Sequence, residues 1–309
     1  MFTEKRLLFY YAITPVHMGA GQALDVIDNP IQREPHTGWP YFAGSGVKGA
    51  LRDVAEEMWG KSQVQRWFGP DAGAEELHAG AISFTDAQLV LFPARALREG
   101  FVWLTSPIAL QRLARMAAAA GIRAQALDAL AEAGGPTDDE AWIAQAGEKE
   151  LVEGGRLVVE AYDFAARAKP EVDEAAKWLA EQALQASDAH AFFRKKLARH
   201  LVVVSDGQLS FFAKHGTFVE PHVRIDDATG TADDGGLFFT ENLPPEAVMA
   251  GLVMASCERA PKGKGGEGAK AEDIVGEVEA LLKGAGTVQL GGDATTGRGL
   301  VALSVLGGA

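Results

Sequence analysis

The sequence predicts an α+β fold in which an antiparallel sheet carries its helices on one side. Short runs of aromatic and aliphatic residues, typical of buried strands, recur near both ends of the chain. Stretches with apolar residues at helical spacing stand between these runs. The resulting order is strand, helix, strands, helix, a long insertion, a hairpin, helix and strand. The 309 residues suffice for one large domain or two small ones, and we interpret them as a single domain.

The first 119 residues predict a strand, a helix, several further strands and a second helix. Residues 7–14 form a continuous apolar run that Pro15 ends, as in a buried strand. Residues 18–40 are rich in glycine and proline and predict a loop. Ser45 is a suitable N-cap for a helix that starts near Gly46 and buries an apolar stripe. That stripe consists of Val47, Leu51, Val54 and Met58. The elements expected next are strands at 80–84, 88–92 and 101–104, and a helix at 108–119 after Pro107.

The middle of the chain changes character twice. Residues 120–200 are rich in alanine and acidic residues and predict a mostly helical insertion, with helices at 171–184 and 189–197. Residues 201–245 return to β character and predict a long protruding hairpin with a turn at 226–230. Two phenylalanine pairs are expected in the core, Phe192-Phe193 and Phe211-Phe212.

The last part of the chain completes the expected body. Residues 262–268 lack apolar side chains and predict a loop, and 272–282 predict a helix. Strands are expected at 287–290 and 300–305. Residues 1–119 and 246–309 would then form one sheet-bearing body.

Composition bounds the function only loosely. The net charge of −13 argues against nucleic acid, but residues 1–116 carry 11 Lys and Arg against 12 Asp and Glu and are nearly neutral. Cys257 is the single cysteine of the sequence, which excludes an intrachain disulfide and suits a cytoplasmic location. The first apolar run is too short to cross a membrane, so we expect no membrane association.

Two features could hold phosphate groups. Lys48 and Arg52 lie four residues apart and share a face of the expected first helix, near the end where backbone N–H groups attract anions. The ordinary explanation for such a pair is a solvated helix face. The glycine-rich stretch 291–299 would let the backbone approach a phosphate closely, although a flexible turn explains it equally well. Phosphate binding by this stretch would be favoured over a flexible turn if the stretch lay beside Gly19 and Gly21.

Acid–base chemistry could come from the loop after the first strand. Asp25 and Asp28 lie in this loop, with His17 close in sequence. A carboxylate and an imidazole could move protons or hold a divalent cation over a phosphodiester. The bland alternative is that Asp28-Asn29-Pro30 merely starts a turn. Phosphate-loop, zinc-protease and α/β-hydrolase motifs do not occur in the sequence.

Taken together, these segments resemble the RAMP superfamily of CRISPR proteins, and more narrowly the backbone subunits of type III-B, or Cmr, effector complexes. The resemblance rests on four stretches and covers both ends and the proposed hairpin, but not the 120–200 insertion. The stretches are Asp28-Asn29-Pro30-Ile31-Gln32-Arg33-Glu34, Thr37-Gly38-Trp39-Pro40, Gly44-Ser45-Gly46-Val47-Lys48-Gly49 and the glycine-rich 291–299. Parts of the hairpin, 224–226, 229–232 and 237–239, agree as well.

The resemblance implies a hand-like protein that stacks in several copies along one guide RNA. A palm related to the RNA-recognition or ferredoxin-like fold would comprise 1–119 and 246–309, with helical fingers at 120–200 and a hairpin thumb at 201–245. Its slicer aspartate matches Asp28, which would cleave target RNA with a divalent cation, Mg²⁺ or Mn²⁺, as cofactor and Asp28 as its ligand. His17 and Glu241 are weaker catalytic candidates. RNA-binding positions would be Arg33, Ser45, Lys48, Arg52, Arg224, Gly291, Gly292, Thr295, Gly297 and Arg298. Partners would be guide RNA, single-stranded target RNA, further copies of the chain and other Cmr subunits.

Two alternatives stay open at this point. The chain could be a filament protein that binds and spaces guide RNA without cutting. More distantly, it could be a metabolic protein of ferredoxin-like fold whose glycine loop takes a small phosphate ligand. Asp25 could also share the role of Asp28.

Overall fold

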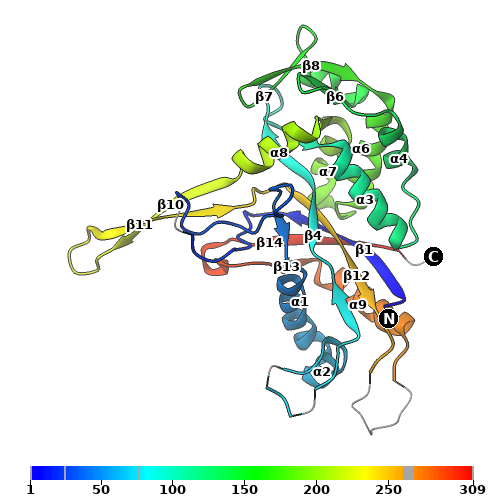
Figure 1. Ribbon diagram of the computed structural model, residues 1–309, viewed down its shortest axis with the longest axis vertical. Coiled ribbons are helices and arrows are strands. Elements are labelled where there is room, and N and C mark those ends of the chain that lie inside the picture. The colour runs from blue at the N-terminus through cyan, green and yellow to red at the C-terminus, as the bar shows by residue number, and fades with distance from the viewer. Residues whose placement is uncertain (1, 24–25, 72, 76, 260–267, 308–309) are drawn as a thin grey trace.

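The computed structural model describes residues 2–23, 26–71, 73–75, 77–259 and 268–307. A large sheet runs through the molecule and a separate two-stranded hairpin projects from it (Figure 1). The strands are β1 (Glu4–Ala12), β2 (Tyr41–Phe42), β3 (Ile82–Phe84), β4 (Ala87–Arg95), β5 (Phe101–Thr105), β6 (Glu140–Ile143), β7 (Arg156–Val159), β8 (Tyr162–Ala168), β9 (Leu201–Val203), β10 (Phe218–Ile225), β11 (Ala232–Asn242), β12 (Val248–Ala255), β13 (Thr287–Gln289) and β14 (Leu300–Leu306). The α-helices are α1 (Gly44–Trp59), α2 (Lys61–Phe68), α3 (Pro107–Ala119), α4 (Gln125–Glu132), α5 (Glu148–Leu151), α6 (Pro170–Gln182), α7 (Ala191–His200), α8 (Asp206–His215) and α9 (Ala271–Ala285).

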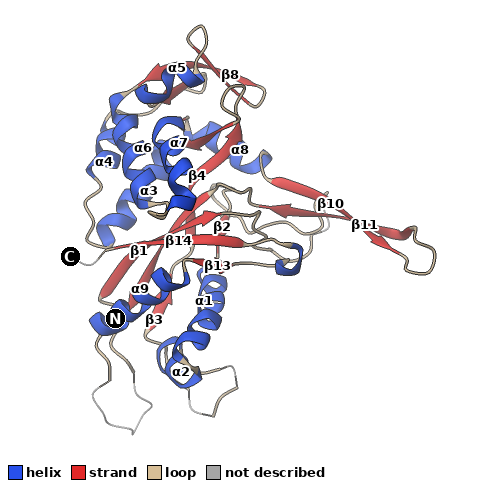
Figure 2. Ribbon diagram, turned by 180° about the vertical axis from the view of Figure 1, so that it is seen from behind, coloured by secondary structure: helices blue, strands red, loops and turns tan. Residues whose placement is uncertain are grey.

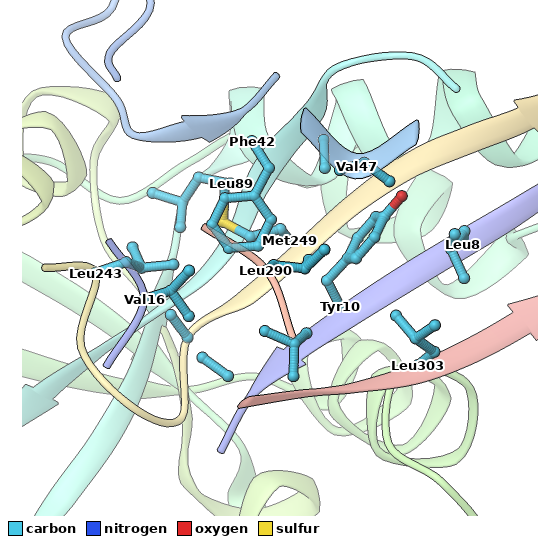
Figure 3. Packing of buried hydrophobic residues seen from close by; sticks show 14 of the residues in the cluster. Leu8, Tyr10, Val16, Phe42, Val47, Leu89, Leu243, Met249, Leu290 and Leu303 are labelled. Carbon is cyan, nitrogen blue, oxygen red and sulfur yellow. The ribbon is translucent and has the colours of Figure 1, made fainter. Parts of the chain in front are cut away.

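Strand β1 lies at the centre of the body and is buried on both faces. It pairs antiparallel with β12 on one side and β14 on the other, which brings the two ends of the chain together. Leu8 and Tyr10 pack into one hydrophobic cluster, while Leu7 and Phe9 pack into another. A strand covered on both faces reads as a continuous apolar run, which explains why the sequence predicts it well. Figure 3 shows the first cluster around Tyr10.

Helices cover both faces of the sheet, so the expectation of helices on one side is wrong. Helices α1 and α9 pack on the face of Leu8 and Tyr10. The other face is covered by α3, α4, α6 and α7, which lie on the opposite side of the sheet in Figure 2. Sequence periodicity identifies a buried helix stripe but does not reveal which face of a sheet receives it.

The large sheet is mixed, whereas we expected an antiparallel one. Strands β5 and β9 pair in parallel, as do β6 and β8. The connection from β5 to β9 runs through α3 to α7, and a crossover of that length permits parallel pairing. The fold is therefore α+β with a mixed sheet.

The region 120–200 is less helical than predicted, because β6, β7 and β8 lie among its helices and extend the large sheet. Residues 201–215 do not belong to the hairpin. They form β9, which is part of the large sheet, and α8, which the sequence analysis missed.

The predicted hairpin is confirmed over β10 and β11, which pair from Phe218 with Asn242 to Ile225 with Ala232. The turn at 226–230 is also confirmed, because the Asp226 carboxylate accepts hydrogen bonds of 2.8 Å from the N–H groups of Ala228 and Thr229. The hairpin extends away from the body (Figures 1 and 2). Exposed apolar side chains lie along it: Phe218, Val219, Val223, Ile225 and Leu237.

Other local expectations fail for identifiable reasons. Helix α1 begins at Gly44, after Ala43, and its first N–H donates to Asp86 Oδ1 at 2.8 Å, so Ser45 is not the cap. Of the phenylalanine pairs expected in the core, Phe192 is 67% exposed and Phe211 is 39% exposed. In the part of the chain that the structure covers, every helix is too short or too polar to cross a membrane.

Glu246 gives the fold a predicted pH dependence. Its carboxylate accepts a hydrogen bond from the Tyr11 hydroxyl, and burial raises its pKa from 4.5 to about 7. Because the folded pKa is higher, this group stabilises the fold fully below pH 4.5, and that stabilisation is lost as the pH rises through 7. Between pH 5 and 8 the wild type should lose about 1–2 kcal/mol more unfolding free energy than Glu246→Gln, allowing for partial solvent screening. Urea unfolding of both proteins at pH 5 and pH 8 measures this difference in unfolding free energy. Equal losses in the wild type and in Glu246→Gln would contradict the raised pKa of Glu246.

Candidate functional site

The loop that carries Asp28 lies against the base of the hairpin. Asn29 forms a parallel bridge with Thr240 of β11. The Asn29 N–H donates to the Phe239 carbonyl at 3.0 Å, and the Glu241 N–H donates to the Asn29 carbonyl at 3.0 Å. This segment therefore acts as a short extra strand beside β11 and fixes the loop relative to the hairpin.

Asp28 itself is half-buried and oriented by the hairpin backbone. Its Oδ2 accepts a hydrogen bond of 2.7 Å from the Phe239 N–H. Its carbonyl accepts another of 2.9 Å from the Ala23 N–H, which closes the loop. The bond to Oδ2 gives the carboxylate a defined direction, and the bond to the backbone carbonyl fixes the residue that carries it, as a general base or a metal ligand requires. Asp25, the second candidate carboxylate, lies outside the described residues.

Glu241 is a buried junction between the Asp28 loop, the hairpin and α8. Its Oε1 is 2.5 Å from Arg33 Nη2 and accepts a 2.7 Å bond from the Thr217 hydroxyl, while Oε2 accepts a 3.0 Å bond from the Ile31 N–H. Arg33 also donates to the carbonyls of Gly38 at 2.8 Å and Ala213 at 2.9 Å. These contacts suit residues that position a site rather than residues that touch a substrate.

His17 joins the hairpin to the terminal glycine loop. Its Nδ1 lies 2.7 Å from the Glu241 carbonyl oxygen, and its backbone forms a bridge with Gly292. The Gly292 N–H donates to the His17 carbonyl at 2.9 Å. The terminal loop thus contacts the start of the first glycine-rich loop at His17, two residues before Gly19.

Gly291 is required by close approach as well as by conformation. Its φ is +80°, and a Cβ there would lie 2.3 Å from the His17 carbonyl oxygen. Gly297 has a similar φ of +82°, but nothing lies within 4 Å of its Cβ position. We expect Gly291→Ala to destabilise the fold by about 3 kcal/mol or more, and Gly297→Ala by about 1 kcal/mol. Equal losses of unfolding free energy in the two variants would contradict the contact with His17.

The rest of the terminal loop is open to solvent. Residues 291–297, including Thr295, are exposed, and Asp293 adopts a left-handed conformation with φ +61°. Arg298 forms an ion pair with Glu220 of β10, and its guanidinium lies 5.8 Å from the centre of the Phe218 ring. The loop is thereby tied to the same hairpin base that orients Asp28.

The cations of α1 are more enclosed than expected. Lys48 Nζ donates to the Ile82 carbonyl at 3.0 Å, and burial, aided by the nearby Arg52 charge, lowers its pKa. Arg52 donates to the Gly69 carbonyl at 2.8 Å and forms a 2.6 Å ion pair with Asp71. Contact with a phosphate would have to compete with these partners. By contrast, Ser45 is exposed, and Arg224 on β10 has 71% of its side chain exposed.

The site can supply a divalent cation with one protein carboxylate, so the remaining ligands would have to come from bound RNA or water. Groups of three or more His, Cys, Asp or Glu side chains able to hold a metal ion are absent from the described residues. Asp28 offers one carboxylate, and the Glu241 carboxylate is already bound by protein groups. One carboxylate suits a Mg²⁺ or Mn²⁺ ion shared with the phosphate oxygens of a bound RNA. It does not suit a cage built by the protein alone.

The partners that hold the site together were not predicted from the sequence. They are the Phe239 backbone, Thr217 and Glu220, and each lies far along the chain from the residue it contacts. Chemically, the site combines one oriented carboxylate with an exposed glycine loop and an exposed hairpin. That combination can bind an extended phosphate chain and act on one of its bonds.

The fold and this site define the class of the protein. The family model of the RAMP superfamily matches residues 9–302, so the chain belongs to the RAMP superfamily. It is similar to the CRISPR system Cmr endoribonuclease Cmr4 of Pyrococcus furiosus, with 27% identity over 304 residues, 97% of this chain and 95% of that protein. The resemblance seen in the sequence motifs is thereby confirmed.

Solved structures agree in fold. The structure of oligomeric Cmr4 from Pyrococcus furiosus has 21% identity and a TM-score of 0.69, with 99% of each chain covered. A chain of the type III-B Cmr-beta complex bound to cognate target RNA has 18% identity and a TM-score of 0.72, with 98% of each chain covered. At these identities the likeness concerns the fold.

Proposed function

We propose that this chain is the backbone subunit of a type III-B CRISPR effector complex and that it cleaves target RNA through Asp28. Copies would stack along a guide RNA, and base pairing rather than the protein would read the target. Membership of the RAMP superfamily and the likeness to a Cmr endoribonuclease support this proposal. The observation that carries it is the Asp28 carboxylate, fixed at the base of a projecting hairpin.

In this proposal each part of the molecule has its own role. Residues 1–119 and 246–309 serve as the palm, 120–200 with α4 to α7 as the fingers, and β10–β11 as the thumb. The terminal glycine loop and Ser45 lie open to guide phosphates, with Arg298 held nearby. The exposed side chains of the thumb would press between bases and splay a target nucleotide at regular intervals.

The cleavage step needs little beyond alignment and a base. Asp28 accepts the proton of the target 2′-hydroxyl as that oxygen bonds to the adjacent phosphorus. The bond from phosphorus to the 5′ oxygen breaks, and that oxygen takes a proton from water. The products are a 2′,3′-cyclic phosphate and a 5′-hydroxyl. A bound cation would stabilise negative charge on the phosphate. Glu241 and Arg33 position the loop, and His17 ties the hairpin to the terminal loop.

The second candidate is a non-catalytic protein that binds and spaces guide RNA. One observation favours this candidate: the Asp28 Oδ2 already accepts a hydrogen bond from the Phe239 N–H, so this oxygen has a structural role in the fold. The assembled complex, loaded with guide RNA, should be given labelled complementary RNA with Mg²⁺ and with a chelator. Cleavage at a constant interval that stops with the chelator supports the nuclease. Tight target binding without cleavage under both conditions supports the spacer.

A further inference from the structure

A pocket lined by aromatic rings lies at the root of the hairpin, and the proposed function does not use it. Its cavity of about 300 Å³ lies where the end of α8 meets the turn between β7 and β8 and the end of β4. Rings and charged groups line it: Tyr162, Phe211, Phe212, His215, Arg95 and Glu160. Because α8 runs almost directly into β10, the pocket lies where the hairpin leaves the body (Figure 1).

Two of these rings are exposed although their neighbours hold them in place. Tyr162 is 36% exposed and Phe211 is 39% exposed. Their rings meet edge to face with centres 5.2 Å apart, and Tyr162 makes a second edge contact, at 5.5 Å, with the buried ring of Phe212. The His215 ring lies 4.7 Å from that of Phe211. Such contacts favour defined ring orientations, so a flat ligand would meet a preformed surface.

Exposed cations stand beside the rings. The Arg95 side chain is 76% exposed, and its Nε lies 3.5 Å from Glu160 Oε2, an exposed pair that contributes little. Glu160 is anchored separately, because its Oε1 accepts a 3.0 Å bond from the Arg95 N–H and its own N–H donates to the Arg95 carbonyl at 2.8 Å. The guanidinium can therefore turn towards an anion without releasing the turn. Lys214, in the last turn of α8, is also exposed. Aromatic faces next to cations are the combination that binds unpaired bases together with their phosphates.

The pocket is joined to the Asp28 loop through a shared set of contacts. Arg33 donates to the Ala213 carbonyl in α8 at 2.9 Å and pairs with Glu241. Thr217, which follows α8, donates to Glu241 at 2.7 Å. The same buried junction therefore holds the helix that carries one wall of the pocket and the loop that carries the carboxylate.

We propose that this pocket binds one unpaired nucleobase of the bound RNA, stacked on Tyr162 and Phe211, with an adjoining phosphate at Arg95. The inference rests on the proposed function, in which the hairpin presses a nucleotide out of the guide–target duplex. A base taken out of the duplex loses its stacking neighbours, and the rings at the hairpin root replace them. Every base has a π face, so the site accepts any base and leaves sequence reading to base pairing. The chemistry is the same for a base of either strand, and the test distinguishes the two.

The test is photocrosslinking in the guide-loaded complex, with 5-iodouridine placed in turn at each position of one cleavage interval. One arm carries it in the target RNA and the other in the guide, and mass spectrometry maps the crosslinked residues. We expect one position per interval, in one strand, to crosslink to Tyr162 or Phe211 several times more strongly than the other positions. Phe192 is the matched control, because it is 67% exposed but lines a separate pocket beside α7, and it should stay at background.

Affinity measures the stacking itself. Phe211→Ala should weaken binding of a short oligouridine to the purified full chain by about fivefold or more, as expected for the loss of one stacked base. Phe211→Tyr keeps the ring and should bind like the wild type, and Phe192→Ala should stay within about twofold. If Phe211→Ala fails to fold, Tyr162→Leu replaces it and should weaken binding to a similar extent.

Two results would overturn the proposal. One is an equal affinity for oligouridine in Phe192→Ala and in a folded Phe211→Ala or Tyr162→Leu protein. The other is a complex whose crosslinks reach the hairpin or the terminal loop but not Tyr162, Phe211 or His215, and cleavage through Asp28 would survive that result. A complex that binds no RNA at all would end this proposal and the proposed function together.

Discussion

Asp28→Asn is expected to slow target cleavage by the assembled complex at least about 100-fold, the usual contribution of a general base. The substitution is nearly isosteric, and the amide oxygen can still accept the hydrogen bond from the Phe239 N–H, which is 2.7 Å long in the wild type. The loop should therefore keep its place while the negative charge is lost. Guide binding and target binding should be unchanged, since neither depends on this carboxylate in our account.

Matched variants separate the role of Asp28 from general effects. Asp128→Asn changes an exposed carboxylate on α4, away from the site, and should leave the cleavage rate within about twofold of the wild type. Asp28→Ala removes both the charge and the bond to Phe239, so it should lose cleavage and some stability as well. Full activity in Asp28→Asn together with inactivity in Asp25→Asn would contradict the assignment.

Glu241→Ala should lower the free energy of unfolding by about 3 kcal/mol. It leaves the Arg33 guanidinium without its carboxylate and deprives the Ile31 N–H and the Thr217 hydroxyl of their acceptor. Because these contacts join the Asp28 loop to the hairpin, cleavage should fall along with stability. Urea unfolding measures the first effect, and a single-turnover assay below the unfolding transition measures the second.

A double-mutant cycle with Arg33→Ala tests the cause. Once Arg33 is absent, Glu241→Ala should cost clearly less than it does alone, because part of its cost is an unpaired charge. Additive losses would show that the pair is not coupled. A Glu241→Ala loss below about 0.5 kcal/mol would contradict the buried junction altogether.

The sequence predicted those parts of the fold whose signal is local. The apolar run of β1, the helices α3, α6 and α9, and the Asp226 turn are confirmed within a few residues, and the hairpin is confirmed over β10 and β11 but not over 201–215. The mixed sheet and the two covered faces were not foreseen, because pairing partners and face assignment depend on contacts between distant segments. Helix α8 was missed for a different reason: its phenylalanines lie in a short amphipathic stretch between strands.

The candidate site was predicted in outline but not in its connections. The terminal glycine loop was expected to matter if it lay beside Gly19 and Gly21, and the structure brings it against His17, two residues before Gly19. The partners of the cations were not anticipated. Arg33 pairs with a glutamate 208 positions away and Arg298 with one 78 positions away. Local spacing identifies a cation that could meet a phosphate, but it does not show that the cation is already paired.

The central claim is that each copy cuts the target once through its own Asp28. Complexes assembled from mixtures of wild-type and Asp28→Asn chains, followed by target cleavage and product mapping, test it most directly. The account predicts a ladder at a constant nucleotide interval, with 2′,3′-cyclic phosphate ends. Cleavage at each internal site should fall in proportion to the wild-type fraction and vanish when that fraction is zero. A ladder that persists in complexes made only of Asp28→Asn chains would contradict it.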